Sequence, residues 1–464
     1  MPLSDIETVV IVIMENRSFD HMLGYLNLPR PNRLDVEGLT DDPTWQAAHA
    51  NYDGTTRYDL QPITQQAIDD PPHEQATIAI QINTPPQPGS PHKMGGFVIS
   101  YLQRTPAPQN PTLVMGYYIA PQVPTFDFFA RQFVVCDHWF AALPTGTQAN
   151  RLMAMSGESR LIDNATLFLP EQDLVYDWLT GHHASWCVYQ SGDFFPFFSL
   201  MPRWLGEITT SLTLSALGGR GRFRRYAQFH EQWRADAPMP QVIFIEPAYT
   251  DGPHDTPNDD HPPTGIAAGQ AFLADIYATL IANPTRWRNT LMLVTYDEHG
   301  GFFDHVEPPP IPTTVAGFPF ATTGVRVPAF VISPHVQPGT VFRGTLDHTS
   351  LLQLLADRFN PGQTYSAAVA ARQAQLSRVA EVLLPTAPPV ARSPVLPPIP
   401  APSAPATVVS QGGFAGAPGA TANAQAFHRV ALKVAQDHPD LLASPGWAHL
   451  ATYVHAAQNP QGAP

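Results

Sequence analysis

The sequence is poor in charged residues, in basic ones above all, and it has almost no cysteine. Charged residues fill 14% of the 464 positions, against about a quarter in an average globular protein. The formal net charge of −14 argues against the basic surface that a nucleic-acid partner requires. The two cysteines, Cys136 and Cys187, lie in apolar runs, so buried free thiols are expected in preference to a disulfide.

Long hydrophobic runs are also missing. The apolar run near the N-terminus, residues 8–14, is far shorter than the roughly 20 residues of a transmembrane helix, and no other run reaches that length. The N-terminus lacks the charged region and small-residue cleavage site of a secretory signal. We therefore expect no transmembrane segment, and a cytoplasmic location by default, with an exported mature form left open.

The chain does contain short apolar runs and much proline. Hydrophobic residues make up 44% of it and proline fills 51 positions, about double the usual share. Apolar runs alternate with helical stretches between residues 8 and 358. This alternation predicts an α/β fold with a mostly parallel central sheet flanked by helices. The proline content predicts long ordered loops, including an excursion over residues 27–93.

Composition changes near the C-terminus divide the chain into three parts. Residues 384–420 are rich in proline, alanine, serine and glycine without periodicity, which is typical of a linker or a tail draped over the surface. Helical spacing returns in residues 421–464, which predicts a small helical appendage. The main domain is expected to comprise residues 1–383.

Two buried-strand patterns each run directly into a pair of oxygen-bearing side chains. The strands are residues 8–13 and 291–296. Either strand end alone could be an ordinary polar loop. In an open α/β sheet, however, ligands bind beyond the carboxyl ends of the strands, and together the four side chains could hold one divalent cation. Oxygen ligands leave Ca²⁺, Mg²⁺, Mn²⁺, Fe and Zn²⁺ open. The candidate ligands are Glu15, Asn16, Asp297 and Glu298.

A Pro/Gly turn delivers Thr147 to the start of an expected helix at residues 148–156. Backbone N–H groups and the positive end of the helix dipole favour a bound phosphate there. A hydroxyl whose pKa is lowered by a metal ion becomes a nucleophile. The alternative is a helix cap, for which threonine is well suited. Asn150 and Arg151 follow on the first turn, where an arginine could bind phosphate oxygens.

Other polar side chains lie near expected strands and helices. Asp260 and His261 end a polar loop that follows an apolar strand, and loops of this kind often form sites. His348 stands at the start of an expected helix, with Asp347 or Thr349 as the cap.

An aromatic cluster comprises residues 194–198 and Trp204. Core packing is its default interpretation, and a greasy substrate rim is the alternative. His73 lies in a loop, where a histidine is usually just solvated.

Four separated motifs resemble those of the phosphoesterase family and follow one another in the family's order. This family contains bacterial and plant non-specific phospholipases C and certain acid phosphatases, and belongs to the alkaline-phosphatase-like superfamily. The resemblance covers about residues 6–358 and implies an alkaline-phosphatase-like fold. The motifs are Glu15-Asn-Arg-Ser-Phe-Asp-His21, Thr147-Gln-Ala-Asn-Arg151, Asp260-His-Pro262 and Asp297-Glu-His-Gly-Gly-Phe-Phe-Asp-His305.

The resemblance implies a role for each matched position. Thr147 would be the nucleophile, forming a phospho-threonine, and a further metal contact. Its segment departs from the family, which more often has proline just before the asparagine, so Thr145 stays open as the alternative nucleophile. The implied metal ligands are Glu15, Asn16, Thr147, Asp297 and Glu298. The histidines implied to surround the phosphate are His73, His261 and His348, and the other implied site residues are Asn150, Arg151, Asp260 and His305.

The expected function is therefore metal-dependent hydrolysis of a phosphoric ester. The resemblance favours a phospholipase C acting on phosphatidylcholine-like lipids, with transient contact to a membrane surface. A broad-specificity acid phosphatase is the alternative. A non-catalytic module that binds metal or phosphate is a minor alternative, because the same fold can carry different functions.

Overall fold

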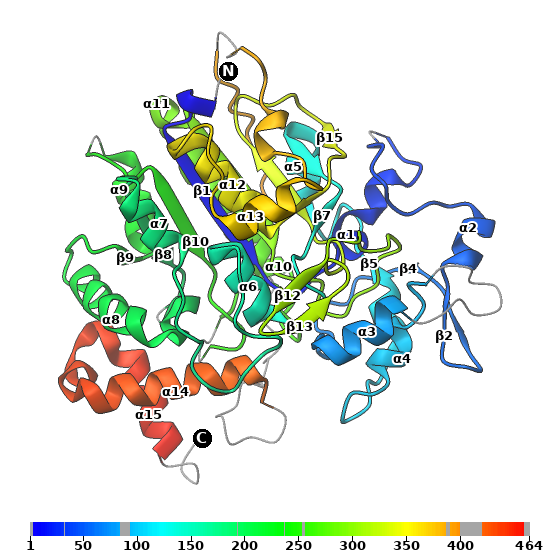
Figure 1. Ribbon diagram of the computed structural model, residues 1–464, viewed down its shortest axis with the longest axis horizontal. Helices are drawn as coiled ribbons and strands as arrows, with labels where there is room; N and C mark the ends of the chain where they lie inside the picture. Colours follow the sequence, from blue (N-terminus) through cyan, green and yellow to red (C-terminus); the bar gives the residue numbers. More distant parts are fainter. Residues whose placement is uncertain are drawn as a thin grey trace.

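An eight-stranded sheet forms the centre of the protein (Figure 1). The computed structural model describes residues 3–31, 33–83, 93–192, 194–235, 237–252, 256–386, 390–399 and 420–458. All strands of this sheet run parallel except β14, which pairs antiparallel with β11 and β6. The mostly parallel α/β sheet is thus confirmed. In spatial order the strands are β15 (Thr340–Phe342), β6 (Val134–Cys136), β14 (Ala329–Ile332), β11 (Thr290–Tyr296), β1 (Thr8–Met14), β10 (Val242–Glu246), β8 (Trp186–Gln190) and β9 (Phe223–Arg225).

The two strands that precede the candidate metal ligands are direct neighbours. β1 and β11 pair in parallel from Thr8 opposite Thr290 to Met14 opposite Tyr296. β11 is buried along its whole length, and β1 along all but its first residue. Apolar, β-branched sequence suits strands covered on both faces. Because the strands are in register and end together, the residues that follow them emerge side by side at one edge of the sheet.

Helices flank the sheet, as predicted. In Figure 1, α12 crosses in front of β1. It packs against α6, whereas α10 packs against α5 and α9. The helices are α1 (Phe19–Leu23), α2 (Pro43–Ala48), α3 (Gln75–Asn83), α4 (Phe97–Tyr101), α5 (Pro124–Gln132), α6 (Thr147–Ser156), α7 (Val175–Gly181), α8 (Pro202–Ala216), α9 (Ala227–Arg234), α10 (Ala267–Ile281), α11 (Pro284–Trp287), α12 (His348–Phe359), α13 (Ala367–Gln373), α14 (Ala422–Asp437) and α15 (Ala448–Gln458).

Short two-stranded pairs brace the loops around the sheet. The expected excursion over residues 27–93 contributes α2, α3 and three of these short strands, and α3 packs on α4 over a small apolar cluster of its own. Residues 84–92 of that excursion lie outside the described chain. The pairs are β2 (Asn51–Tyr52) with β3 (Arg57–Tyr58), β4 (Gln61–Pro62) with β5 (Gly116–Tyr117), β7 (Trp139–Phe140) with β16 (Leu346–Asp347), and β12 (Thr313–Val315) with β13 (Phe318–Phe320).

The aromatic cluster at residues 194–204 is core and not a substrate rim. Phe194 is 1% exposed and Trp204 is 6% exposed. Trp204 packs edge-on against Tyr176, and Phe195 packs against Trp447 near the C-terminus. Burying rings of this size stabilises the core, so none of this surface remains to contact lipid. The suggestion of a greasy rim there was wrong.

The C-terminal segments pack on the main body. Helices α14 and α15 pack against each other, as the helical spacing predicted. Of the expected linker, residues 387–389 and 400–419 lie outside the described chain, while the indole of Trp287 donates to the carbonyl of Arg392 at 2.7 Å. Both cysteines are buried free thiols, as expected. None of the described helices is long and apolar enough to cross a bilayer.

A partly exposed ion cluster beside β6 makes stability depend on pH. His138 contacts Asp137 at 2.9 Å and Glu37 at 2.7 Å. Burial opposes the imidazolium, but hydrogen bonds to Asp137 and Glu37 outweigh burial and raise the pKa of His138 to about 9. The interaction is therefore complete below the unfolded pKa of about 6.5 and is lost as pH rises through 9.

We accordingly expect the stability advantage of wild type over His138→Leu to shrink between pH 6 and pH 9.5. The loss should be on the order of 1 kcal/mol, since Glu37 is half exposed and solvent screens the pair. Thermal unfolding of both proteins at the two pH values measures it. A gap in melting temperature that stays constant would contradict the assignment.

Candidate active site

The residues after β1 and β11 interlock at the sheet edge. The backbone N–H of Asn16 donates to Asp297 Oδ1 at 3.1 Å, and Asn16 itself has a left-handed φ of 61°. Gly300 packs against this turn, where an added Cβ would lie 2.1 Å from the carbonyl oxygen of Asn16. Its φ of 63° also favours glycine. Gly300 thus permits the close approach that brings the two strand ends together.

Four buried oxygen atoms around this edge have no hydrogen-bond partner among the described residues. Buried polar atoms are normally paired, so a group of unpaired oxygens indicates a place where a cation or ligand binds. Each atom comes from a different residue of the metal-ligand set implied by the sequence. They are Glu15 Oε2, Asn16 Oδ1, Thr147 Oγ1 and Glu298 Oε1. This donor set, hard oxygens with several carboxylates, fits a divalent cation.

Keeping the carboxylates of this group charged costs free energy, because they are buried away from water. Burial raises the pKa of Glu15 well above its ordinary value and raises that of Asp297 to about 6. Asp297 Oδ1 accepts the N–H groups of Asn16 and Glu298, so its orientation is fixed by the backbone. A bound cation would offset the cost of burying these charges.

The hydroxyl of Thr147 has no hydrogen-bond partner in the part of the chain that the structure describes, whereas that of Thr145 is engaged. Gly146 is the N-cap of α6, so Thr147 does not act as the cap. Thr145 donates to the carbonyl of Ile162 at 2.7 Å and to Asp163 Oδ1 at 3.1 Å. Thr147 Oγ1, at the first turn of the helix, is the better candidate nucleophile.

The amide of Asn150 shapes the turn that carries Thr147. Its Nδ2 donates to the carbonyl of Thr145 at 2.7 Å, and its Oδ1 accepts the N–H of Leu143 at 2.9 Å. The side chain therefore positions the turn before Thr147 through its backbone.

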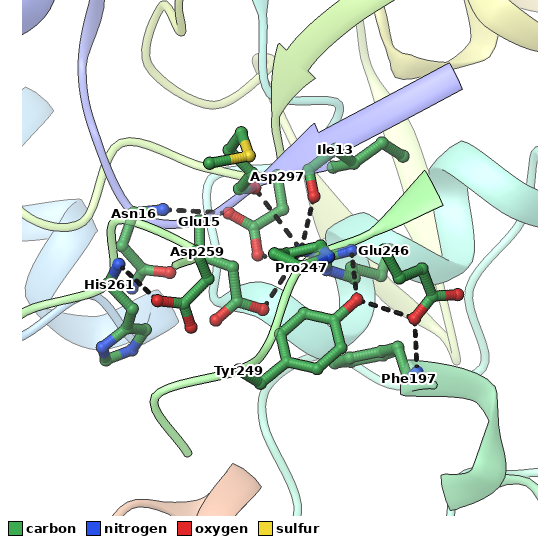
Figure 2. Close-up of polar contacts among 12 residues, drawn as sticks. Ile13, Glu15, Asn16, Phe197, Glu246, Pro247, Tyr249, Asp259, His261 and Asp297 are labelled. Atoms are coloured by element: carbon green, nitrogen blue, oxygen red, sulfur yellow. Dashed lines mark hydrogen bonds and ion pairs between the residues drawn. The ribbon is translucent and has the colours of Figure 1, made fainter. Parts of the chain in front are cut away.

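The guanidinium of Arg151 binds the carboxylates of two candidate metal ligands. Its Nη2 lies 3.1 Å from Glu15 Oε1 and its Nε lies 3.4 Å from Asp297 Oδ2. Its Nη1 donates to the hydroxyl of Tyr249 at 3.2 Å, which in turn donates to Glu246 at 2.8 Å (Figure 2). All three nitrogens are used in these contacts, so Arg151 links α6 to the candidate metal ligands.

His73 and His261 lie together beside this edge, with their ring centroids 5.7 Å apart. His73 Nε2 is 3.2 Å from Asn16 Nδ2. Burial alone would lower the pKa of His73, but Glu298 and Asp70 outweigh it and raise this pKa to about 10. His261 Nε2 is buried and without a partner in the described chain, although Asp251 Oδ2 lies 4.0 Å away. Both imidazoles are suited to carry positive charge near a substrate.

His348 does not face the same space with a free nitrogen. The indole N–H of Trp139 donates to its Nδ1 at 3.2 Å, and its Nε2 contacts the carbonyl oxygen of Asp297 at 2.5 Å. Burial lowers the pKa of His348 to about 4, so the ring is neutral at physiological pH. It is placed to hold the backbone of Asp297. Asp347 is the N-cap of the helix, one of the two predicted possibilities.

Asp260 and His305 have structural partners. The hydroxyl of Tyr296 donates to Asp260 Oδ2 at 2.5 Å, and burial raises the pKa of Asp260 to about 7. His305 Nδ1 lies 2.6 Å from Asp20 Oδ2, in a cluster with Asp304 that is separate from the His73–His261 group. The structure therefore does not bring His305 to the candidate metal ligands.

Sequence reasoning missed the residues that support the site from β10 and the loop after it. Glu246 ends β10, Tyr249 binds Arg151, and Asp251 faces His261. The rule that placed ligands after β1 and β11 applies equally to β10, which pairs with β1 in parallel. Applied to β10, the same rule would have pointed to Glu246, Tyr249 and Asp251.

Comparison with known proteins agrees with these motifs. Residues 6–361 match the phosphoesterase family. The chain belongs to this family. Non-specific phospholipase C1 of Arabidopsis thaliana is 31% identical to it, over 76% of this chain and 67% of that protein. Phospholipase C A of Mycobacterium tuberculosis (strain H37Rv) is 28% identical, over 77% of this chain and 73% of its own. The protein is thus a hydrolase acting on phosphate esters.

Solved structures similar to this one are distant from it. A phosphonate monoester hydrolase of Agrobacterium radiobacter matches 52% of this chain and 69% of its own with a TM-score of 0.32 and 14% identity. A protein in the alkaline phosphatase superfamily from Vibrio parahaemolyticus matches 59% of this chain and 65% of its own with a TM-score of 0.31 and 11% identity.

Proposed function

We propose that this phosphoesterase is a metal-dependent phospholipase C that acts through a phospho-threonine on Thr147. The observation that carries the proposal is the group of unpaired buried oxygens, in which the hydroxyl of Thr147 joins three side chains from two strand ends. The names of the relatives, phospholipases C of a plant and a bacterium, support the choice of reaction.

In the first step, the Thr147 hydroxyl gives up its proton to solvent as Oγ1 attacks phosphorus, and the bond between phosphorus and the leaving alcohol breaks. His261 is placed to protonate the leaving oxygen. Its Nδ1 contacts the carbonyl of Pro262, whereas its Nε2 has no partner in the described chain, so a proton on Nε2 can be transferred to the substrate. His73, with its raised pKa, is cationic at neutral pH and offsets charge on the phosphate. Water then attacks phosphorus and passes a proton to His261, the bond to Thr147 breaks, and Oγ1 takes a proton from solvent to restore the hydroxyl.

The candidate metal ligands would act with these residues. A divalent cation held there would lower the pKa of the Thr147 hydroxyl and neutralise phosphate charge. Arg151 forms ion pairs with Glu15 and Asp297 and so keeps both carboxylates oriented at the edge where β1 and β11 end. The residues that would hold the ion are Glu15, Asn16, Thr147, Asp297 and Glu298.

A second candidate is a broad-specificity acid phosphatase. It is favoured by the burial of the aromatic cluster at residues 194–204, which removes the one lipid-binding surface suggested by the sequence. Hydrolysis of p-nitrophenyl phosphorylcholine and of p-nitrophenyl phosphate distinguishes the two. Preference for the diester supports the phospholipase C, and preference for the monoester supports the phosphatase.

Removal of divalent ions is expected to lower the rate of ester hydrolysis at least about 100-fold, because charge stabilisation at phosphorus is lost. The measurement is hydrolysis of the preferred ester before and after treatment with a chelator. Activity should return when a single divalent ion is added back and should identify the ion. Full activity in the chelated protein, with metal content below one-tenth of the protein, would refute the metal requirement.

A further inference from the structure

Helix α14 lies beside the active site although it is distant from it in the sequence. Residues 422–437 fall outside the part of the chain that matches the family, which ends at residue 361. Figure 1 shows α14 across the end of the molecule near α6 and α8. One face of the helix is buried, and three residues at its start contact three different supports of the site.

The first contact reaches the neighbourhood of His261. Thr421, the N-cap of α14, accepts the N–H of Ala424 and donates its hydroxyl to Asp251 Oδ1 at 2.7 Å. The other oxygen, Asp251 Oδ2, is buried, has no partner in the described chain and faces His261 Nε2 at 4.0 Å. Thr421 therefore fixes which oxygen of Asp251 faces the imidazole.

The second contact reaches the nucleophile helix. Gln148, the residue after Thr147, donates its Nε2 to Asn423 Oδ1 at 2.9 Å. The backbone N–H of Gln148 is held by Asn164 Oδ1 at 2.8 Å. Asn423, which is distant from α6 in the sequence, thus restrains the first turn of that helix through the side chain of Gln148.

The third contact reaches the support of the candidate metal ligands. Phe427 stacks on Tyr249, with ring centroids 5.7 Å apart and planes inclined by 24°. The hydroxyl of Tyr249 joins Glu246 to Arg151, which binds Glu15 and Asp297 (Figure 2). Phe427 is itself buried, so its ring fixes the position of Tyr249 in this network.

We infer that α14 is a positioning element of the active site and not only a stabilising appendage. Thr421, Asn423 and Phe427 hold Asp251, Gln148 and Tyr249, and through them they orient the general acid, the nucleophile and the metal ligands. The inference rests on the proposed function of these groups. Supporting residues of this kind are typically worth about 10- to 100-fold in activity or metal affinity.

The test uses the full-length protein with two substitutions, Thr421→Val and Asn423→Ala, combined. The matched control is Val434→Ala, on the buried face of α14 two turns beyond Phe427. We expect kcat on the preferred ester to fall about 10-fold or more in the double variant, with KM little changed. Val434→Ala should lower the melting temperature comparably but keep kcat. Thr421→Ser, which retains the hydroxyl, should keep kcat as well.

Equal kcat values for the double variant and Val434→Ala would overturn the inference, since α14 would then only stabilise the fold. If the wild-type protein hydrolyses neither ester, the proposed function fails, and Mn²⁺ binding decides the inference instead. Phe427→Leu removes the stacked ring but fills the space, and we expect it to weaken the Kd for Mn²⁺ about tenfold. A Kd equal to that of Val434→Ala would overturn the inference.

Discussion

Replacing Thr147 by alanine is expected to reduce ester hydrolysis at least about 10³-fold, because the attacking oxygen is removed. The fold should not suffer. Thr147 Oγ1 is buried without a partner in the described chain, and removing an unpaired buried hydroxyl costs little stability or none. The measurement is kcat/KM on the preferred ester together with the melting temperature. Thr147→Ser, which keeps a hydroxyl at the same position, should retain part of the activity.

Thr145→Ala provides the matched control for this prediction. The same chemical change now removes a hydroxyl that binds Ile162 and Asp163, so we expect a stability loss of about 1 kcal/mol and a rate loss of no more than about tenfold. The opposite pattern, with Thr147→Ala active and Thr145→Ala inactive, would assign the nucleophile to Thr145.

Much of the fold could be predicted because the sequence marks its strands clearly. The apolar runs before Glu15 and Asp297 became β1 and β11, and their parallel pairing followed from the alternation of strands and helices. The direction of β14 could not be predicted in this way. An apolar run indicates a strand, but its orientation depends on the path of the preceding loops, and periodicity carries no information about that path.

The site residues likewise fall into those that the sequence predicts and those that it does not. Ligand candidates at strand ends could be read from the sequence, since parallel strands bring their carboxyl ends to one edge. The partners of Arg151 and His348 could not, because hydrogen bonds between distant segments leave no local pattern. Arg151 stands one helical turn after Thr147 and could have pointed to a phosphate, yet its guanidinium is committed to Glu15 and Asp297. Contacts from α14 were hidden for the same reason.

Replacing Arg326 by methionine is expected to destabilise the protein by about 3–5 kcal/mol. Its side chain is 0% exposed, and it donates to Asp304 Oδ1 at 2.9 Å and to Asp20 Oδ1 at 3.2 Å. Its Nη1 also binds the carbonyls of Glu37 and Asp137. Methionine fills much of the volume but leaves the buried carboxylates of Asp20 and Asp304 without their guanidinium partner. Denaturant unfolding of both proteins measures the difference.

Arg343→Met is the matched control, because Arg343 pairs with Asp35 at 2.9 Å while both side chains are more than half exposed. An exposed pair of this kind is worth no more than about 1 kcal/mol, so the two substitutions should differ several-fold in cost. Adding Asp20→Asn and Asp304→Asn to Arg326→Met should recover part of the lost stability if uncompensated charge causes the loss. No recovery would show instead that the hydrogen bonds of Arg326 to Glu37 and Asp137 dominate. Arg326 would then act mainly by holding the backbone of Glu37 and Asp137, and charge balance would be secondary.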